Sequence, residues 1–537
     1  MKVIKIQHKQ IFNQVIPQSR PKILFIVLTY LRDEGNSGNI QDYPYGILSI
    51  IKHNEKIADF NVLDLIVDPN NESYLDKVVD VISEFKPDII GLSLMFDNAY
   101  FSLAPVSETC KKYIVNILIV AGGPAISPVA HKVLANQPNL DAICFSEGEL
   151  PMEHLIKSDN YRELLVKHPS WVTRNIDTKI ENTAPSKTLL EDLSTVVDID
   201  YSYLEKFPYM VKTSYNPIDS RYINNLRAFT IITSRGCPFK CTFCWHSGED
   251  DRSMRYANVD ALILHIDRLV NQYEANSIFI YDDMLLLNLN RAKEIFRKLA
   301  PYNLRIELPN GLSPTYFDAE LVELMYLAGV RSVRLAIESG DEWVVRKLVN
   351  KPMKISHVKM AIDLLRKYKI WVIGFFVVGL PGETDDHRKT TLEKIYEWGI
   401  DNCAVSVASP IKGSLLYEEC LREGYIDPNA EFLVSGYLFG ENVINTDSYS
   451  ANYISEQAYL INLDVNFVNS NRIVRGDFEI GYDYFMHVSK TYEGHAFAHY
   501  FQSYCAEKLG LRNQAQYSFD KAMIIRNESE EWSKYFN

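Results

Sequence analysis

The stretch AFTIITSRGCPFKCTFCWH, residues 228–246, joins a strand-like run to a loop that holds three cysteines. Its first six residues are apolar or β-branched, which favours a buried β-strand. Cys237, Cys241 and Cys244 follow within eight positions, whereas the other five cysteines of the chain are scattered. A glycine and a proline beside the first cysteine can turn three thiol groups inward. This stretch therefore predicts a strand that delivers three thiols to one loop.

More strand-like runs follow this loop, separated by helical stretches such as DAELVELMYLAG. A βα series of this length predicts a partial barrel of six units, with functional residues on loops at the carboxyl ends of the strands. The six strand candidates are residues 228–234, 277–281, 303–308, 331–337, 370–378 and 402–408.

Short apolar runs also alternate with helix-length segments ahead of the barrel. They predict a doubly wound α/β sheet of five parallel strands, whose ligand crevice lies at the carboxyl ends. The runs are residues 22–28, 60–67, 88–94, 116–123 and 141–145. We expect this domain at 1–157, a polar connector at 158–224, the barrel at 225–425 and a mostly helical region at 426–537.

Composition excludes several classes of function. The chain has 537 residues, 47% of them hydrophobic and 23% charged, which is typical of a globular protein with several cores. The formal net charge of −13 disfavours nucleic acid as a partner. No apolar run reaches the roughly 18 residues of a membrane span. The first residues lack the apolar core of a signal peptide, so we expect a cytoplasmic protein whose cysteines stay reduced.

Clustered thiols in a reducing compartment favour metal binding. The loop could hold an iron-sulfur cluster, in which three ligands on four irons leave one iron open to substrate. A zinc site completed by His246 is the alternative, but His246 is only two residues from Cys244 and no second cysteine pair stands nearby. The remaining cysteines are expected to be buried small apolar residues, namely Cys110, Cys144, Cys403, Cys420 and Cys505.

The C-x3-C-x2-C spacing, with Phe243 before the last cysteine, resembles the radical S-adenosylmethionine (SAM) enzymes. The resemblance implies that the three cysteines are the catalytic ligands of a 4Fe-4S cluster and that Phe243 lies beside it. It further implies that SAM binds the open iron and is cleaved to a 5'-deoxyadenosyl radical. The stretches IFIYDDMLLLN, LPNGLSP, VRLAIESGDEWV and GFFVVGLPGET fall where that family places its strand ends.

These strand ends supply the candidate SAM ligands. By the resemblance, Asp282 and Asp283 accept from the SAM ammonium group, and Asn310 lies on the next loop. Asp282 could instead cap the following helix.

The ends of two further strands carry candidate residues for SAM binding. Glu338 falls where the family contacts the ribose or amino acid of SAM, and Arg334 on the same strand face could meet the carboxylate or pair with a barrel carboxylate. Gly379 and Pro381 belong to a loop that either lies near the adenine or is a structural turn.

The N-terminal domain resembles the cobalamin-binding module found ahead of many radical SAM barrels, in YPYGILSII, KPDIIGLSL, VAGGPAISP and DAICFSEGEL. The resemblance places Ser93, Gly122, Gly123 and Glu147 around the corrin, on crevice loops 94–101, 122–128 and 145–149 or next to them. The two glycines could equally serve a tight turn.

One departure concerns the lower cobalt ligand. The Asp-x-His-x-x-Gly motif that supplies an axial histidine elsewhere is absent, because His53, His131 and His154 each stand in a different context. This removes an axial ligand from that motif without excluding the cofactor.

Near the C-terminus, Ala515, Phe519 and Ala522 have the spacing of the second helix of a tetratricopeptide repeat. One repeat cannot fold as a solenoid, so a packed helix pair is expected, with a partner-binding surface as the alternative.

Together these resemblances imply a transferase with a 4Fe-4S cluster, SAM and cobalamin that methylates carbon in an unidentified small molecule or peptide. A flavodoxin or ferredoxin would supply the electron. The alternatives are radical cyclisation, oxidation or rearrangement without methyl transfer, and a non-catalytic iron-sulfur scaffold.

Overall fold

The computed structural model of the chain describes residues 20–29, 43–66, 74–95, 97–174, 185–204, 219, 221, 225–248, 253–427 and 443–536. Several parts of the predictions therefore lie outside the described residues, among them residue 67 of the predicted strand 60–67 and parts of the predicted domains 1–157 and 225–425. Much of the connector, residue 96 of the crevice loop 94–101, and residues 428–442 of the C-terminal region also lie outside them.

The N-terminal region forms a six-stranded sheet in the order β2-β1-β3-β4-β5-β6. Its first five strands are parallel, which confirms the doubly wound sheet. The sixth strand pairs antiparallel with the fifth and lies inside the predicted connector. The strands are β1 Lys22–Val27, β2 Asp59–Asp64, β3 Ile89–Ser93, β4 Leu118–Gly122, β5 Ala142–Cys144 and β6 Trp171–Thr173.

The two faces of this sheet belong to different apolar cores. The face with Leu24 and Ile26 packs with residues of α2 and α3. The face with Ile23 and Phe25 packs with residues of α1 and α5, and that core continues without a break into the barrel. The helices are α1 Tyr45–Asn54, α2 Tyr74–Phe85, α3 Leu103–Tyr113, α4 Ala130–Asn136, α5 Glu149–Ile156 and α6 Tyr161–Lys167.

The barrel consists of two parallel three-stranded sheets, β11-β10-β7 and β12-β13-β14. Single bridges between Ile306 and Val330 and between Leu312 and Leu335 join them, as expected of a six-unit partial barrel. The strands are β7 Ala228–Ile231, β10 Ser277–Ile280, β11 Arg305–Glu307, β12 Ser332–Glu338, β13 Trp371–Val378 and β14 Asn402–Val407.

Helices follow the barrel strands, and a short antiparallel ribbon flanks the cysteine loop. The ribbon comprises β8 Ser234–Arg235 and β9 Arg255–Tyr256. The helices are α7 Val259–Tyr273, α8 Leu289–Leu299, α9 Ala319–Ala328, α10 Ser356–Lys367, α11 Asp385–Trp398 and α12 Leu415–Arg422.

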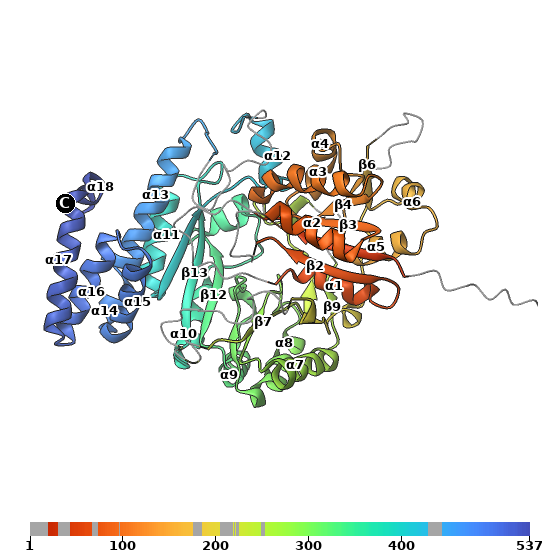
Figure 1. Cartoon of the computed structure of the whole chain (residues 1–537). Helices are drawn as coiled ribbons and strands as arrows, with labels where there is room; N and C mark the ends of the chain where they lie inside the picture. The colour runs from red at the N-terminus through yellow and green to blue at the C-terminus, as the bar shows by residue number, and fades with distance from the viewer. Residues whose placement is uncertain are drawn as a thin grey trace, which may run out of the picture.

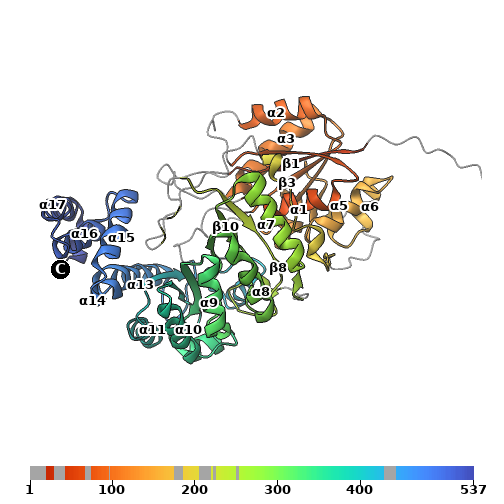
Figure 2. The ribbon, with the colours of Figure 1, turned by 90° about the horizontal axis from the view of Figure 1, so that it is seen from below.

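The C-terminal helices lie at the far side of the barrel from the N-terminal sheet, as both views show (Figures 1 and 2). Asn462 and Asn466 attach them to the backbone of β14. In the helix with repeat-like spacing Ala522 is buried, while Phe519 is exposed. The helices are α13 Ala451–Leu463, α14 Asn471–Arg475, α15 Phe478–Thr491, α16 Ala496–Lys508, α17 Arg512–Glu528 and α18 Glu530–Tyr535. Within the described ranges, no helix is long and apolar enough to span a membrane.

Candidate cluster and cofactor site

The cysteine loop follows the β8 strand and is fastened at several points. Gly236 has a φ of 98°, and a Cβ there would lie 2.3 Å from the Ser253 carbonyl oxygen, so only glycine fits. The Thr242 amide donates to the Val349 carbonyl (2.9 Å), and its hydroxyl donates to the Leu348 carbonyl (2.6 Å). The loop is thus held between the ribbon and the segment after β12.

The three thiols of this loop are partly buried and close enough to influence one another. The pKa of Cys241 is raised to about 12, mainly by burial; the Lys351 ammonium opposes this rise, and the Glu338 carboxylate and the other two thiols add to it. Burial likewise raises the pKa of Cys244 to about 11, with Cys237 adding to the effect. Iron or another cation would be needed to hold these thiolates in their charged form.

This donor set fits a cubane better than a single ion. Among the described residues, no group of three His, Cys, Asp or Glu side chains is arranged to hold one metal ion. In a cubane each thiolate binds a different iron, so its three ligands need not converge on one point. Phe243, between the last two cysteines, packs against the main core.

Asp282, at the end of β10, is buried and fully engaged. Its carboxylate accepts from the Thr233 amide, the Thr233 hydroxyl and the Ser234 hydroxyl, each at 2.6 Å. Burial raises its pKa despite these hydrogen bonds. The helix-cap alternative does not apply, because Asn288 caps α8. Asp282 holds the start of the cysteine loop, and its role toward SAM stays a prediction.

The neighbouring polar residues also face the loop region. Asp283 pairs with His246, with 3.2 Å between the Asp283 Oδ2 and His246 Nε2 atoms. The Asn310 side chain donates to the Tyr281 carbonyl at 2.8 Å and so ties the loop after β11 to the end of β10. The structure thus brings Asp282, Asp283 and Asn310 together at one end of the barrel.

Glu338 ends β12 in an uncommon backbone conformation, with a φ of 70° beside an irregularity in the strand register. Its carboxylate forms a buried ion pair with the Lys351 ammonium (2.7 Å), which also donates to the Ala336 carbonyl (2.6 Å). Non-glycine residues in this region cluster at functional sites. Lys351 carries no motif that identifies it from sequence, and only the folded chain places it beside Glu338 and Cys241.

Arg334 lies on the same strand and points to another carboxylate. Its guanidinium is 3.8 Å from the Glu307 carboxylate and donates to the Leu308 carbonyl at 3.4 Å. In the structure, therefore, Arg334 adopts the barrel pairing that was one of its two predicted alternatives.

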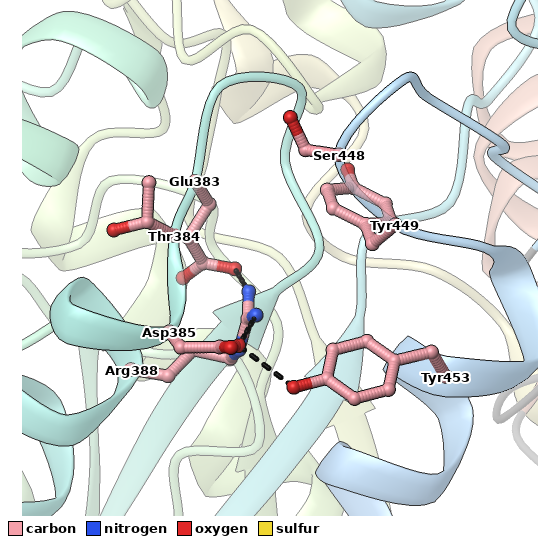
Figure 3. Close-up of a pocket in the computed structure, with 7 residues that line it drawn as sticks. All are labelled: Glu383, Thr384, Asp385, Arg388, Ser448, Tyr449 and Tyr453. Carbon is pink, nitrogen blue, oxygen red and sulfur yellow. Dashed lines mark hydrogen bonds and ion pairs between the residues drawn. The ribbon is translucent and has the colours of Figure 1, made fainter.

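The loop after β13 borders a pocket of about 290 Å³ lined by residues from α11 and from the segment that enters α13 (Figure 3). The Gly379 amide donates to the Glu383 carboxylate (2.5 Å), and the Gly379 carbonyl accepts from the Tyr449 hydroxyl (2.6 Å). Arg388 bridges Glu383 and Asp385. This loop, which includes Pro381, is therefore bound at Gly379 by Glu383, just before α11, and by Tyr449, just before α13.

The predicted corrin-contacting residues lie at the carboxyl edge of the N-terminal sheet. Ser93 and Gly122 are the last residues of β3 and β4. Gly123 has a φ of 120°, and a Cβ would lie 2.1 Å from the Leu94 carbonyl oxygen, so the turn itself requires glycine. Glu147 is bound by Arg235 and Arg255 of the ribbon.

Two of the three histidines considered as axial ligands have partners elsewhere. His53 pairs with Glu153 at 2.8 Å, and His154 contacts His168 at 2.8 Å. His131 lies on α4.

Comparison with known proteins agrees with this geometry. A family model described as "Radical SAM superfamily" matches residues 231–395, and one described as "B12 binding domain" matches residues 41–156. The chain belongs to the radical SAM superfamily, in the group whose barrel follows a B12-binding domain. Membership implies a 4Fe-4S cluster and SAM, and the second domain implies cobalamin.

The chain is also similar to individual methyltransferases and to a cyclase. The chain is 28% identical over 416 residues to cytidylyl-2-hydroxyethylphosphonate methyltransferase of Streptomyces wedmorensis, covering 73% of this chain and 77% of that one. It is 25% identical to anaerobic magnesium-protoporphyrin IX monomethyl ester cyclase of Cereibacter sphaeroides, covering 67% and 57%. The structure of the methyltransferase TsrM from Kitasatospora setae matches in fold with a TM-score of 0.60 at 13% identity, covering 76% and 77%.

Proposed function

We propose that the protein is a cobalamin-dependent radical SAM methyltransferase that acts on a carbon of a small molecule or peptide. The observation that supports this most directly is the contact between the two predicted cofactor regions. Arg235, two residues before the first cysteine, binds Glu147 on the loop after β5 at 2.8 Å. Two cofactors that act on one substrate need such proximity.

Within this proposal, the chain's own residues bind the cofactors and orient them. Cys237, Cys241 and Cys244 would bind the cluster, while Asp282 fixes the strand end that carries them. Glu338 and Lys351 would contact the polar part of SAM. When bound, the cluster and SAM supply a carbon-centred radical and the corrinoid a transferable methyl group.

A second reaction on the same scaffold has a specific observation behind it. Two relatives, which match 67% and 74% of this chain, are named cyclases, although more of the relatives are named methyltransferases. Radical cyclisation, oxidation or rearrangement without methyl transfer is therefore the alternative. We further propose a cytoplasmic enzyme reduced by a flavodoxin or ferredoxin.

Anaerobic reconstitution with iron, sulfide, hydroxocobalamin and SAM bearing a CD₃ group, with dithionite as the reductant, tests the proposal. We expect both 5'-deoxyadenosine and S-adenosylhomocysteine, and the latter should disappear when cobalamin is omitted. Formation of 5'-deoxyadenosine alone, with or without cobalamin, would contradict methyl transfer and support the alternative. No SAM cleavage by a protein with a full cluster would favour a scaffold role.

A further inference from the structure

Two arginines on the short ribbon reach the same carboxylate of the N-terminal domain. Arg235 of β8 stands directly opposite Arg255 of β9. The Glu147 carboxylate accepts from Arg235 at 2.8 Å and from both terminal nitrogens of Arg255 at 2.6 and 2.9 Å. Such charge-assisted, forked hydrogen bonds fix direction as well as distance.

The carboxylate of Glu149 is a second partner of Arg235 in the N-terminal domain. Arg235 lies 2.9 Å from the Glu149 carboxylate and donates to the Ser49 hydroxyl at 2.8 Å, and that hydroxyl donates to Glu149 at 2.5 Å. Ser49 and Glu149 are almost completely buried in α1 and α5. Two carboxylates and two guanidinium groups balance in charge, so the loss of one would leave a buried partner uncompensated.

The network joins the two loops that matter for the proposed chemistry. Glu147 belongs to the loop after β5, at the edge where a doubly wound sheet binds its ligand. Arg235 is separated from Cys237 only by Gly236, which is itself packed against the Ser253 carbonyl. A shift of the loop at 145–149 would therefore reach the first cysteine through only Arg235 and Gly236.

We propose that Arg235 is a positioning residue for the cluster, and that Glu147 and Glu149 couple it to ligand occupancy of the N-terminal domain. The proposal rests on the proposed function, from which it takes the corrinoid and the cluster. Linkage then requires reciprocity. If bound corrinoid changes the affinity for SAM by some factor, bound SAM changes the affinity for corrinoid by the same factor.

The test compares Arg235→Lys and Glu147→Gln with wild type, with Asp219→Asn as the control. Asp219 is also buried and paired with an arginine, Arg221, which donates to the Gly329 carbonyl at the amino-terminal end of β12, away from the cysteine loop. Iron and sulfide content should be full in all variants, because no cysteine is changed.

The first readout is the electron paramagnetic resonance (EPR) spectrum of the reduced cluster with SAM. We expect altered g-values and a SAM affinity lowered about fivefold or more in Arg235→Lys and Glu147→Gln, but not in Asp219→Asn. Unchanged spectra and affinities in both variants, at a melting temperature lowered as far as in the control, would show that the network is structural and overturn the proposal. Should Arg235→Lys fail to fold, Glu147→Gln alone decides, since its side chain is more exposed.

The second readout is the affinity for hydroxocobalamin, measured with and without SAM. In wild type, SAM should change it at least severalfold, and in Glu147→Gln the two values should coincide. Equal values in wild type would overturn the coupling. A wild type that couples the two ligands but forms 5'-deoxyadenosine without S-adenosylhomocysteine would refute the proposed function and leave this inference standing.

Discussion

Glu338 combines a left-handed backbone with a buried ion pair to Lys351, and the two features make different predictions for its removal. Glu338→Gln should weaken SAM binding by roughly 1–3 kcal/mol if a charge-assisted hydrogen bond is lost. It should also lower the free energy of unfolding, because Lys351 is left without its buried partner. Isothermal titration with SAM and urea unfolding measure the two effects separately.

The double variant Glu338→Gln/Lys351→Met separates the role of Glu338 in stability from its role in SAM binding. Removing both charges should restore much of the stability but not the affinity for SAM. Recovery of SAM binding in the double variant would show that Glu338 acts only through the ion pair.

The three cysteines of the loop and the buried cysteines elsewhere should differ in their effect on cluster content. Cys237→Ala, Cys241→Ala and Cys244→Ala should each abolish the brown chromophore, because a second iron would lack a protein ligand. Cys420→Ala, in the buried face of α12, should retain the full iron and sulfide content. A complete cluster in two of the three loop variants would contradict the assignment.

At the scale of elements, the loop after β13 depends on a hydroxyl from the C-terminal segment. Tyr449→Phe leaves the buried Gly379 carbonyl without the donor that it has in the structure. If this loop lies near the adenine, the dissociation constant for SAM should rise about three- to tenfold, as expected for about 1 kcal/mol. Tyr453→Phe is the matched control in the same pocket, because its hydroxyl donates to Asp385 at 2.8 Å (Figure 3). Equal effects of the two variants would argue against a specific role for Tyr449.

The helices α15 to α18 should be sensitive to acid through His495. Its Nδ1 accepts from the Ala498 amide at 3.1 Å, its ring stacks on Phe467, and burial lowers its pKa from 6.5 to about 4. The unfolded chain binds this proton at a higher pH than the folded chain does. Stability is therefore complete above about pH 6.5 and decreases as the pH falls toward 4, by up to about 3 kcal/mol.

Urea unfolding followed by the fluorescence of the adjacent Trp532 measures this dependence. His495→Asn keeps an oxygen that can cap α16 and removes the titrating group, so its stability should vary less between pH 4.5 and 7. An identical pH dependence in wild type and variant would assign the effect to other groups.

The strands differ in how well the sequence predicts them, for physical reasons. Long apolar runs such as 370–378 could be predicted, since one face of the strand is buried, the other is partly buried, and neither carries a polar residue. Trp171–Thr173 could not, because three residues within a polar segment carry no periodicity.

Asp282 shows the same limit in the site. Its position after a strand is visible in the sequence, but its hydrogen bonds run to Thr233 and Ser234, which lie 49 and 48 positions away, and the local sequence pattern contains no such information.

For the whole molecule, the absence of the axial-histidine motif makes a spectroscopic prediction. The reduced, paramagnetic corrinoid should show no nitrogen hyperfine splitting from an axial imidazole. His53→Ala, His131→Ala and His154→Ala should each bind corrinoid as wild type does, and the partners of His53 and His154 agree with this expectation. Clear axial nitrogen coupling would refute the open-ligand model, and loss of that coupling in one variant would identify the ligand.

The single apolar core shared by the N-terminal sheet and the barrel has a consequence for how such chains can be recombined. A sheet transplanted from a relative would meet the barrel through side chains selected for another surface, and mismatched cores lose stability even when every residue is apolar. The ribbon arginines would also have to find their two carboxylates on the new partner. The same core includes Ile444, Tyr449 and Ile454 of the segment that enters α13 and of α13 itself. Functional hybrids should therefore exchange the sheet, the barrel and α13 as one block, with their junction placed beyond α13.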